Sequence, residues 1–160
     1  MKRSSLGISP VVATVILVAI AIVIAIAVAF WASGLVGVFT RFEKLELTSV
    51  FATPTGGNQY TVTINAKNTG SSSATIDAIL INGVQAFTIA GASCTSTGNA
   101  IPGITNTGTC AITSGSPALT PGSTVTITIT GLQPSSPGIT IEVSVHTASG
   151  KTYPSSVLLP

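Results

Sequence analysis

Few side chains in this sequence could do chemistry. There is one histidine, His146, and the acidic residue that invites comparison with a catalytic triad is Asp77. No nucleophile elbow accompanies them, and their spacing supports no Ser-His-Asp arrangement. The sequence also has no phosphate-binding glycine motif, no close pair of carboxylates and too few Cys and His residues for a four-ligand metal site. We therefore predict no catalytic, cofactor-binding or metal site and no enzyme activity, and we interpret His146 as a surface or half-buried strand residue.

The two cysteines, Cys94 and Cys110, lie in one segment rich in Gly, Ser, Thr and Asn. In an exported protein they would form a disulfide, whereas in a reducing compartment they would be free or buried thiols. We expect the disulfide, because the composition favours export. The closed loop of about 15 residues would contribute on the order of 3 kcal/mol to stability. Because this loop is local, it should differ from the disulfide that joins the two sheets of antibody domains.

The composition combines 45% hydrophobic residues with only 6% charged ones, against roughly 25% charged residues in an ordinary soluble domain. Hydroxyl side chains take the place of charges on the predicted surface, which suits an exported domain better than a cytoplasmic one. A net charge of +2 without a basic cluster gives no reason to expect a nucleic-acid partner. No Asn-x-Ser/Thr sequence occurs, so any attached sugar would be on Ser or Thr.

Residues 7–31 contain no charged side chain, and Lys2 and Arg3 precede them. About 20 apolar residues in a helix cross the 30 Å core of a bilayer, and basic residues before such a helix place the N-terminus in the cytoplasm. The run could be an ordinary signal peptide cut after the small-x-small sequence at residues 27–29, although its apolar core is too long for that. It could also be a permanent anchor, or a helix that starts in the membrane and ends elsewhere.

The residues at the start of this apolar run favour the third possibility, a helix that starts in the membrane and ends elsewhere. Gly7-Ile8-Ser9-Pro10-Val11-Val12, after a short basic leader, resembles the start of archaeal type IV pilins. The resemblance implies a leader of residues 1–7 that a prepilin peptidase removes after Gly7, so that the mature chain begins at Ile8. The pattern also makes physical sense, since Ser9 is a good N-cap and Pro10 fits the first helical turn, where its missing N–H costs nothing.

As a pilin, the chain would keep residues 8–42 as a hydrophobic helix, first across the membrane and then in the core of a helical homopolymer built by pilus assembly machinery. The head would lie outside the cell in the filament and meet surfaces. Small residues let helices approach closely, and the residues we expect in the polymer core are Val11, Val15, Ala21, Ala25 and Ala29. Two alternatives remain open: a monomeric, membrane-anchored extracellular binding module, and an archaellin, although archaellins usually open with a glycine-rich stretch instead of Ser-Pro-Val-Val.

Residues 43–160 show a hydrophobic period of two with frequent turn residues, which is typical of short antiparallel strands. Asn82-Gly83 between two apolar runs predicts a two-residue hairpin. The expected strands are Glu46–Ala52, Gln59–Ala66, Ala74–Ile81, Val84–Ile89, Thr109–Thr113, Ser123–Thr130, Ile139–His146 and Thr152–Val157. The expected loops are Thr53–Asn58, Asn68–Ser73, Ala90–Gly108, Gly115–Gly122 and Gln133–Gly138. We therefore predict an α+β chain, with a long N-terminal helix followed by an all-β, immunoglobulin-like sandwich head.

The leader assignment predicts a defined N-terminus. Mass spectrometry of the protein from the cells that produce it should find a mature chain starting at Ile8, with the whole apolar helix retained. A Gly7→Val change should block the cut, because a β-branched side chain crowds a site that passes glycine. A chain starting at Phe30 would instead identify an ordinary signal peptide.

Overall fold

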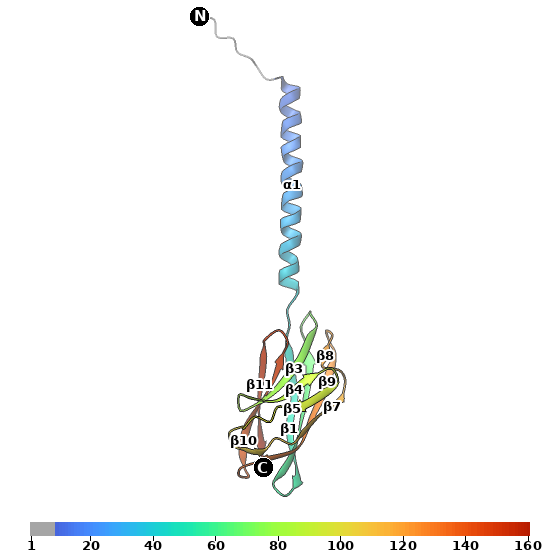
Figure 1. The fold of residues 1–160 in the computed structure, drawn as a ribbon. Helices are drawn as coiled ribbons and strands as arrows, with labels where there is room; N and C mark the ends of the chain where they lie inside the picture. Colours follow the sequence, from blue (N-terminus) through green and yellow to red (C-terminus); the bar gives the residue numbers. More distant parts are fainter. Residues whose placement is uncertain (1–8) are drawn as a thin grey trace, which may run out of the picture. The chain divides into compact units, whose positions relative to one another are not determined.

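The computed structural model describes the backbone of residues 9–160 and, except for residues 38–40, their side chains. The chain divides into two compact units, residues 1–41 and residues 42–160. The first unit contains one helix, α1 (Pro10–Thr40), and the second is an antiparallel β head (Figure 1).

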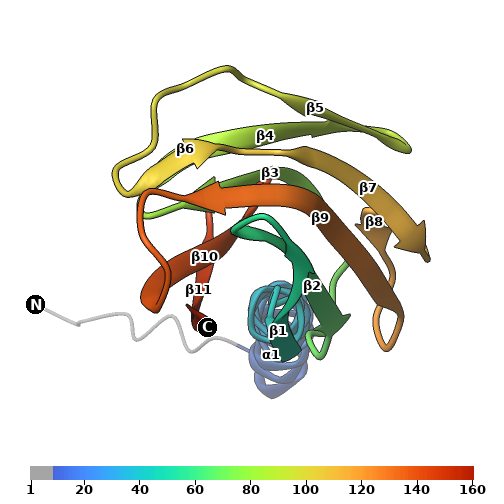
Figure 2. The ribbon, with the colours of Figure 1, turned by 90° about the horizontal axis from the view of Figure 1, so that it is seen from below.

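The head is built from two antiparallel sheets. Strands neighbour one another in the order β1-β2-β9-β6 in the first sheet, where β7 also pairs with β9, and β11-β10-β3-β4-β5 in the second, where β8 pairs with β3. Figure 2 shows the sheets as two curved layers facing each other. The strand bounds are β1 Leu45–Gly56, β2 Gln59–Asn68, β3 Ala74–Ile81, β4 Val84–Ala90, β5 Ser93–Ser96, β6 Ile104–Asn106, β7 Thr109–Ser114, β8 Ala118–Leu119, β9 Thr124–Pro134, β10 Ile139–Thr147 and β11 Thr152–Leu159.

Alternation of side chains along the strands produces the core between the sheets. In β9, Val125, Ile127 and Ile129 are buried, while Thr128 and Thr130 lie on the other face. Each inward β-branched residue stacks on a neighbour from the paired strand, as Ile127 does beside Ile64. The largest fully buried side chains of the described residues are Phe87, Ile64, Ile76, Ile79, Ile81, Leu119, Ile127, Ile129, Leu132, Ile141, Leu159 and Val62.

Both open sides of the sandwich are closed by contacts within the head. On one side the Cys94–Cys110 disulfide joins β5, an edge of the second sheet, to β7 of the first, with the Cα atoms 5.5 Å apart. On the other side β11 lies against β1. Residues flanking these strands add two hydrogen bonds: Lys151 Nζ donates to the Glu43 carbonyl (2.9 Å), and the Tyr60 hydroxyl of β2 donates to the Pro160 carbonyl.

The fold class and the predicted disulfide are confirmed, but the disulfide has a different role from the one expected. It is local in sequence, yet it links the two sheets, because the chain crosses from one sheet to the other between β5 and β6. The predicted hairpin also forms, with positive φ at both Asn82 (50°) and Gly83 (77°).

Several of the segments predicted to be loops contain strands, so those predictions are wrong. Residues 90–108 contain β5 and β6, and residues 115–122 contain β8. These strands have only two to four residues, too few to display a period. β1 also runs on to Gly56 through Pro54, which sits on an edge strand, where proline is tolerated. β9 continues to Pro134, because β6 extends the pairing begun by β7.

Removing the disulfide should loosen one side of the sandwich. A Cys94→Ala/Cys110→Ala variant should lose about 3 kcal/mol in the free energy of unfolding, measured by urea denaturation of the full chain in detergent. The matched control is Ser93→Ala/Thr109→Ala, which changes the exposed residue beside each cysteine and should lose less than about 0.5 kcal/mol. Equal stability of the two variants would show that the sheets need no covalent link.

Candidate functional site: the apolar helix and the collar of the head

The helix begins where the sequence predicts. Pro10 is its first residue, Ser9 occupies the N-cap position, and the Ser9 carbonyl accepts hydrogen bonds from the amides of Val12 (3.0 Å) and Ala13 (3.2 Å). The Ser9 side chain makes no capping hydrogen bond, so it contributes only its extended backbone (φ −54°, ψ 133°). The predicted cleavage residues, Gly7 and Ile8, lie outside the described residues.

The described side chains of the helix are exposed from Pro10 to Gly37. This 28-residue stretch is long and apolar enough to span a membrane, and at 1.5 Å per residue it is about 42 Å long. Thr14, a polar residue within it, donates to the Val11 carbonyl (2.9 Å) and so satisfies its hydroxyl inside the helix. A helix that is apolar on all sides requires lipid or other helices around it.

Small residues recur along this helix at intervals of four. Ala21, Ala25 and Ala29 therefore follow one another on neighbouring turns, and Val11 and Val15 have the same spacing nearer the start. Leu, Ile and Phe side chains project between them, with exposed fractions such as 70% for Leu17 and 77% for Phe30. Gly34 and Gly37 have no atom near the position of an added Cβ, and the helix continues through both to Thr40.

The head holds its own entry segment firmly. Residues 42–44 and the 68–72 loop, together called the collar here, are joined by backbone hydrogen bonds. The Phe42 carbonyl accepts from the amides of Ser71 (3.0 Å) and Ser72 (3.1 Å), while the Lys44 carbonyl accepts from those of Thr69 (2.9 Å) and Gly70 (3.1 Å). The Phe42 amide donates to the Ser71 hydroxyl (3.1 Å). The segment through which the chain enters the head is thus part of the head.

Asn68 organises the collar from inside. Its side chain is fully buried, and its Nδ2 donates to the carbonyls of Ser72 (2.8 Å) and Leu119 (2.9 Å) while Oδ1 accepts from the Gly70 amide (2.9 Å). A buried amide with partners for both its donors and its acceptor is a stabilising arrangement. Gly70 is needed beside it for space, because a Cβ there would lie 2.5 Å from the Phe42 carbonyl oxygen. Asn68 and Gly70 were not singled out from the sequence, because residues of these types are common in any predicted loop.

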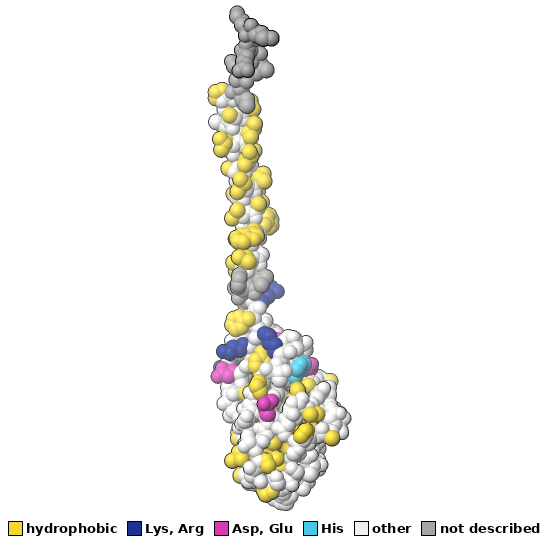
Figure 3. Space-filling model, turned by 90° about the vertical axis from the view of Figure 1, so that its left-hand side faces the viewer, with side chains coloured by type: hydrophobic (Ala, Val, Ile, Leu, Met, Phe, Trp, Pro, Cys, Tyr) yellow, Lys and Arg dark blue, Asp and Glu magenta, His cyan; other side chains and the backbone are white. Residues whose placement is uncertain are grey.

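Charge is distributed unevenly over the head. On the face seen in Figure 3, basic and acidic side chains gather mostly at the end that carries residues 42–44, and hydrophobic and uncharged side chains cover most of the rest. Among the described residues the ion pair is His146 with Asp77, with Nδ1 2.6 Å from Oδ1. No group of three or more His, Cys, Asp or Glu that could hold a metal ion occurs in residues 9–160.

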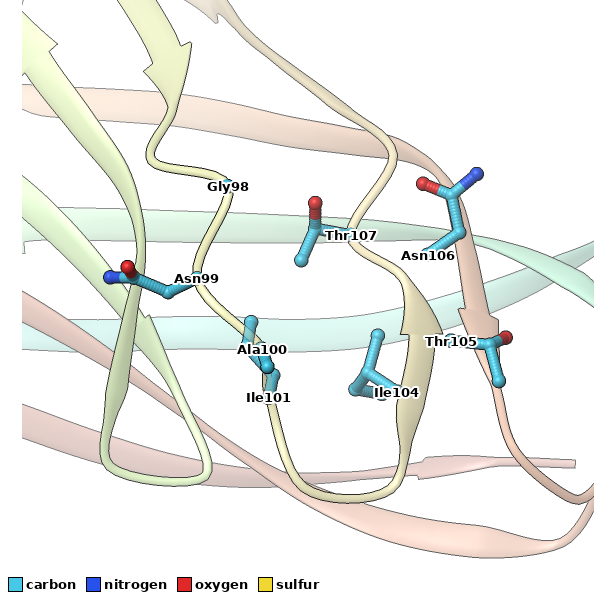
Figure 4. A pocket seen from close by; sticks show the side chains of 8 residues that line it. All are labelled: Gly98, Asn99, Ala100, Ile101, Ile104, Thr105, Asn106 and Thr107. Atoms are coloured by element: carbon cyan, nitrogen blue, oxygen red, sulfur yellow. The ribbon is translucent and has the colours of Figure 1, made fainter.

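The disulfide-bonded loop encloses a hollow of about 310 Å³ between residues 98 and 107. Figure 4 shows Ile101 and Ile104 facing each other across it, while Thr105 and Asn106 point away. The Asn106 side chain accepts from the Gly108 amide (2.9 Å), and Asn99 donates to the Gln85 carbonyl (2.9 Å). Both amide side chains are thus engaged with the backbone, and the surface that the hollow presents is more polar than apolar.

No family model matches the chain, and no curated protein matches it. Among solved structures it is similar to the archaellum periplasmic stator protein FlaG from Sulfolobus acidocaldarius, with 22% identity over 72% of this chain and 99% of that chain and a TM-score of 0.45. It is also similar to a chain in the FlaF–FlaG stator complex from Sulfolobus acidocaldarius, with 22% identity over 72% of this chain and 89% of that chain and a TM-score of 0.45. A structure of the Iho670 flagellar-like filament is 16% identical over 95% of this chain and 99% of that one, with a TM-score of 0.35. Similarities this distant do not establish a function.

The collar predicts a specific effect of Gly70→Ala. The new Cβ would meet the backbone of Phe42 and Lys44 at 2.5 and 2.6 Å, so residues 42–44 must move away from the loop. Overpacking of this kind costs about 1–3 kcal/mol, and hydrogen exchange should become faster at the amides of Ser71 and Ser72. Ser73→Ala, at the exposed position that directly follows this loop, is the control. Unchanged exchange in the glycine variant would show that the collar does not depend on this close approach.

Proposed function

We propose that this chain is a structural subunit of an extracellular filament of the archaeal type IV pilus kind. The carrying observation is the helix of 31 residues, which is apolar on all sides and contains a stretch, Pro10–Gly37, long enough to span a membrane. Before assembly a membrane surrounds it, with the N-terminus in the cytoplasm. After removal of residues 1–7 by a prepilin peptidase, the helices of neighbouring subunits surround it instead.

The head supports this proposal because it has a hydrophobic core of its own. Its hydrophobic core is formed without the helix, because the buried apolar residues in the part of the chain that the structure describes belong to residues 45–159. The subunit can therefore move its helix from lipid into a polymer without refolding the head. The disulfide and the hydroxyl-rich surface suit the exterior of the cell, where the exposed heads would meet surfaces.

The small residues of the helix support a packed environment over a purely lipid one. In a filament core, alanines at intervals of four permit close contact between helices, as small residues do in membrane bundles. A lipid anchor has no such requirement, since lipid chains accommodate side chains of any size. The two roles therefore differ in their tolerance of bulk at Ala21, Ala25 and Ala29.

The test is the triple change Ala21→Leu/Ala25→Leu/Ala29→Leu. Membrane insertion should persist, because hydrophobicity increases. Filaments should disappear from electron micrographs of sheared cell-surface material, because overpacking costs about 1–3 kcal/mol per site in every subunit.

The matched control is Ile20→Leu/Ile22→Leu/Ile26→Leu, which makes as many changes on the same helix without adding volume and should leave filaments intact. Normal filaments from the alanine triple variant would contradict helix packing at these positions and favour a membrane-anchored module. Loss of filaments from the control as well would show that the helix tolerates no change of side chain, whether or not bulk is added.

A further inference from the structure

A second hollow lies on the outer face of the second sheet, across the neighbouring strands β10, β3 and β4. Its volume is about 330 Å³, and its lining residues are Asp77, Ala78, Leu80, Gln85, Thr88 and His146. The lining residues all belong to the head, so binding there can be measured without polymerisation of the helix.

Two β-bulges shape this hollow. Between β3 and β10, Ala78 pairs with His146 and Ile76 with Thr147, which leaves Asp77 as the extra residue. Between β3 and β4, the pairing steps from Phe87 to Gln85 in the same way. In a regular strand Asp77 and Ala78 would face opposite sides of the sheet, but a bulge redirects a side chain. Here the bulge places the Asp77 carboxylate 2.6 Å from His146 Nδ1 on the outer face.

Some of the polar atoms around the hollow form hydrogen bonds within the protein, and others do not. Gln85 Nε2 donates to the Thr88 hydroxyl (3.2 Å). The backbone carbonyl of Gln85 accepts a hydrogen bond from the Thr97 hydroxyl (2.7 Å). Within the part of the chain that the structure describes, Asp77 Oδ2, Gln85 Oε1 and His146 Nε2 have no hydrogen-bond partner. The side chains of Asp77 and His146 are 41% and 32% exposed, and a surface pair of this kind adds little to stability.

The arrangement of these atoms indicates the chemistry of a ligand. A carboxylate oxygen accepts hydrogen bonds, the glutamine amide both accepts and donates, and the free imidazole nitrogen does one or the other. Ala78 and Leu80 supply an aliphatic floor between the polar groups. Hydroxyl groups, which both donate and accept, set on an apolar carbon ring satisfy all of these features.

We propose that this hollow binds a neutral sugar unit, with Asp77, Gln85 and His146 as the hydrogen-bonding residues and Leu80 under the ring. Its volume is at the lower end of the range for small-molecule sites, which fits one hexose. A shallow site with few polar contacts binds weakly, with Kd on the order of millimolar. Many heads on one filament, or on one membrane, would multiply that affinity.

His146 gives a direct readout, because it is the one histidine of the chain. The experiment follows its imidazole NMR signals in the full chain in detergent micelles during titration with glucose, galactose, mannose and N-acetylglucosamine, with glycerol as the control polyol. At least one sugar should shift the signals in a saturable manner, and glycerol should not. Asp77→Asn and Gln85→Ala should each weaken the binding at least about tenfold, whereas Glu46→Gln, the same type of change on an exposed residue of the other sheet, should leave it unchanged.

Three results would overturn the proposal. The first is that no sugar shifts the His146 signals of the unmodified chain, a result that stands even if a variant fails to fold. The second is that glycerol produces the same shift as the sugars. The third is a shift that depends on protein concentration without sugar, which would make the hollow a contact between two copies of the chain.

Discussion

A helix that is apolar on every side cannot remain in water, and the rest of this protein is organised around that constraint. Burial of such a surface is worth about 25 cal/mol per Å², so the helix must always have lipid or protein around it. The head does not meet this need, since its own core is closed by the two sheets and by residues of the head alone. The chain is therefore incomplete by itself, and the identity of what surrounds the helix determines whether it is an anchor or a polymer subunit.

The head complements the helix with a core of its own and with hydrogen bonds that hold its entry segment. Any pull on the chain reaches the collar first, where the Phe42 and Lys44 carbonyls each accept two backbone amides. From there it passes into β1, which is paired with β2 along its length. The disulfide between β5 and β7 and the contact between β11 and β1 close the two sides of the sandwich. In the filament proposed above, these contacts would connect the helix to both sheets of the head.

The sequence predicted those parts of the fold that have a local cause. Pro10 and the uninterrupted apolar run determine the helix, alternating Val, Ile and Thr determine β9, and Asn82-Gly83 determines a hairpin. The features that the sequence did not reveal depend on contacts between distant segments. The short strands β5, β6 and β8 exist because longer neighbours pair with them, Gly70 is required by the approach of Phe42, and the meeting of Asp77 with His146 results from a bulge that breaks the period of two.

The most direct test of the central claim is electron cryomicroscopy of filaments sheared from the cells that produce this protein. If the helix is the core of a polymer, the maps should show a central bundle in which the helices from Pro10 to Gly37 of successive subunits pack against one another, with the β heads on the outside. Recovery of the protein only as single chains in the membrane fraction, or filaments whose core density is not built from this helix, would contradict it.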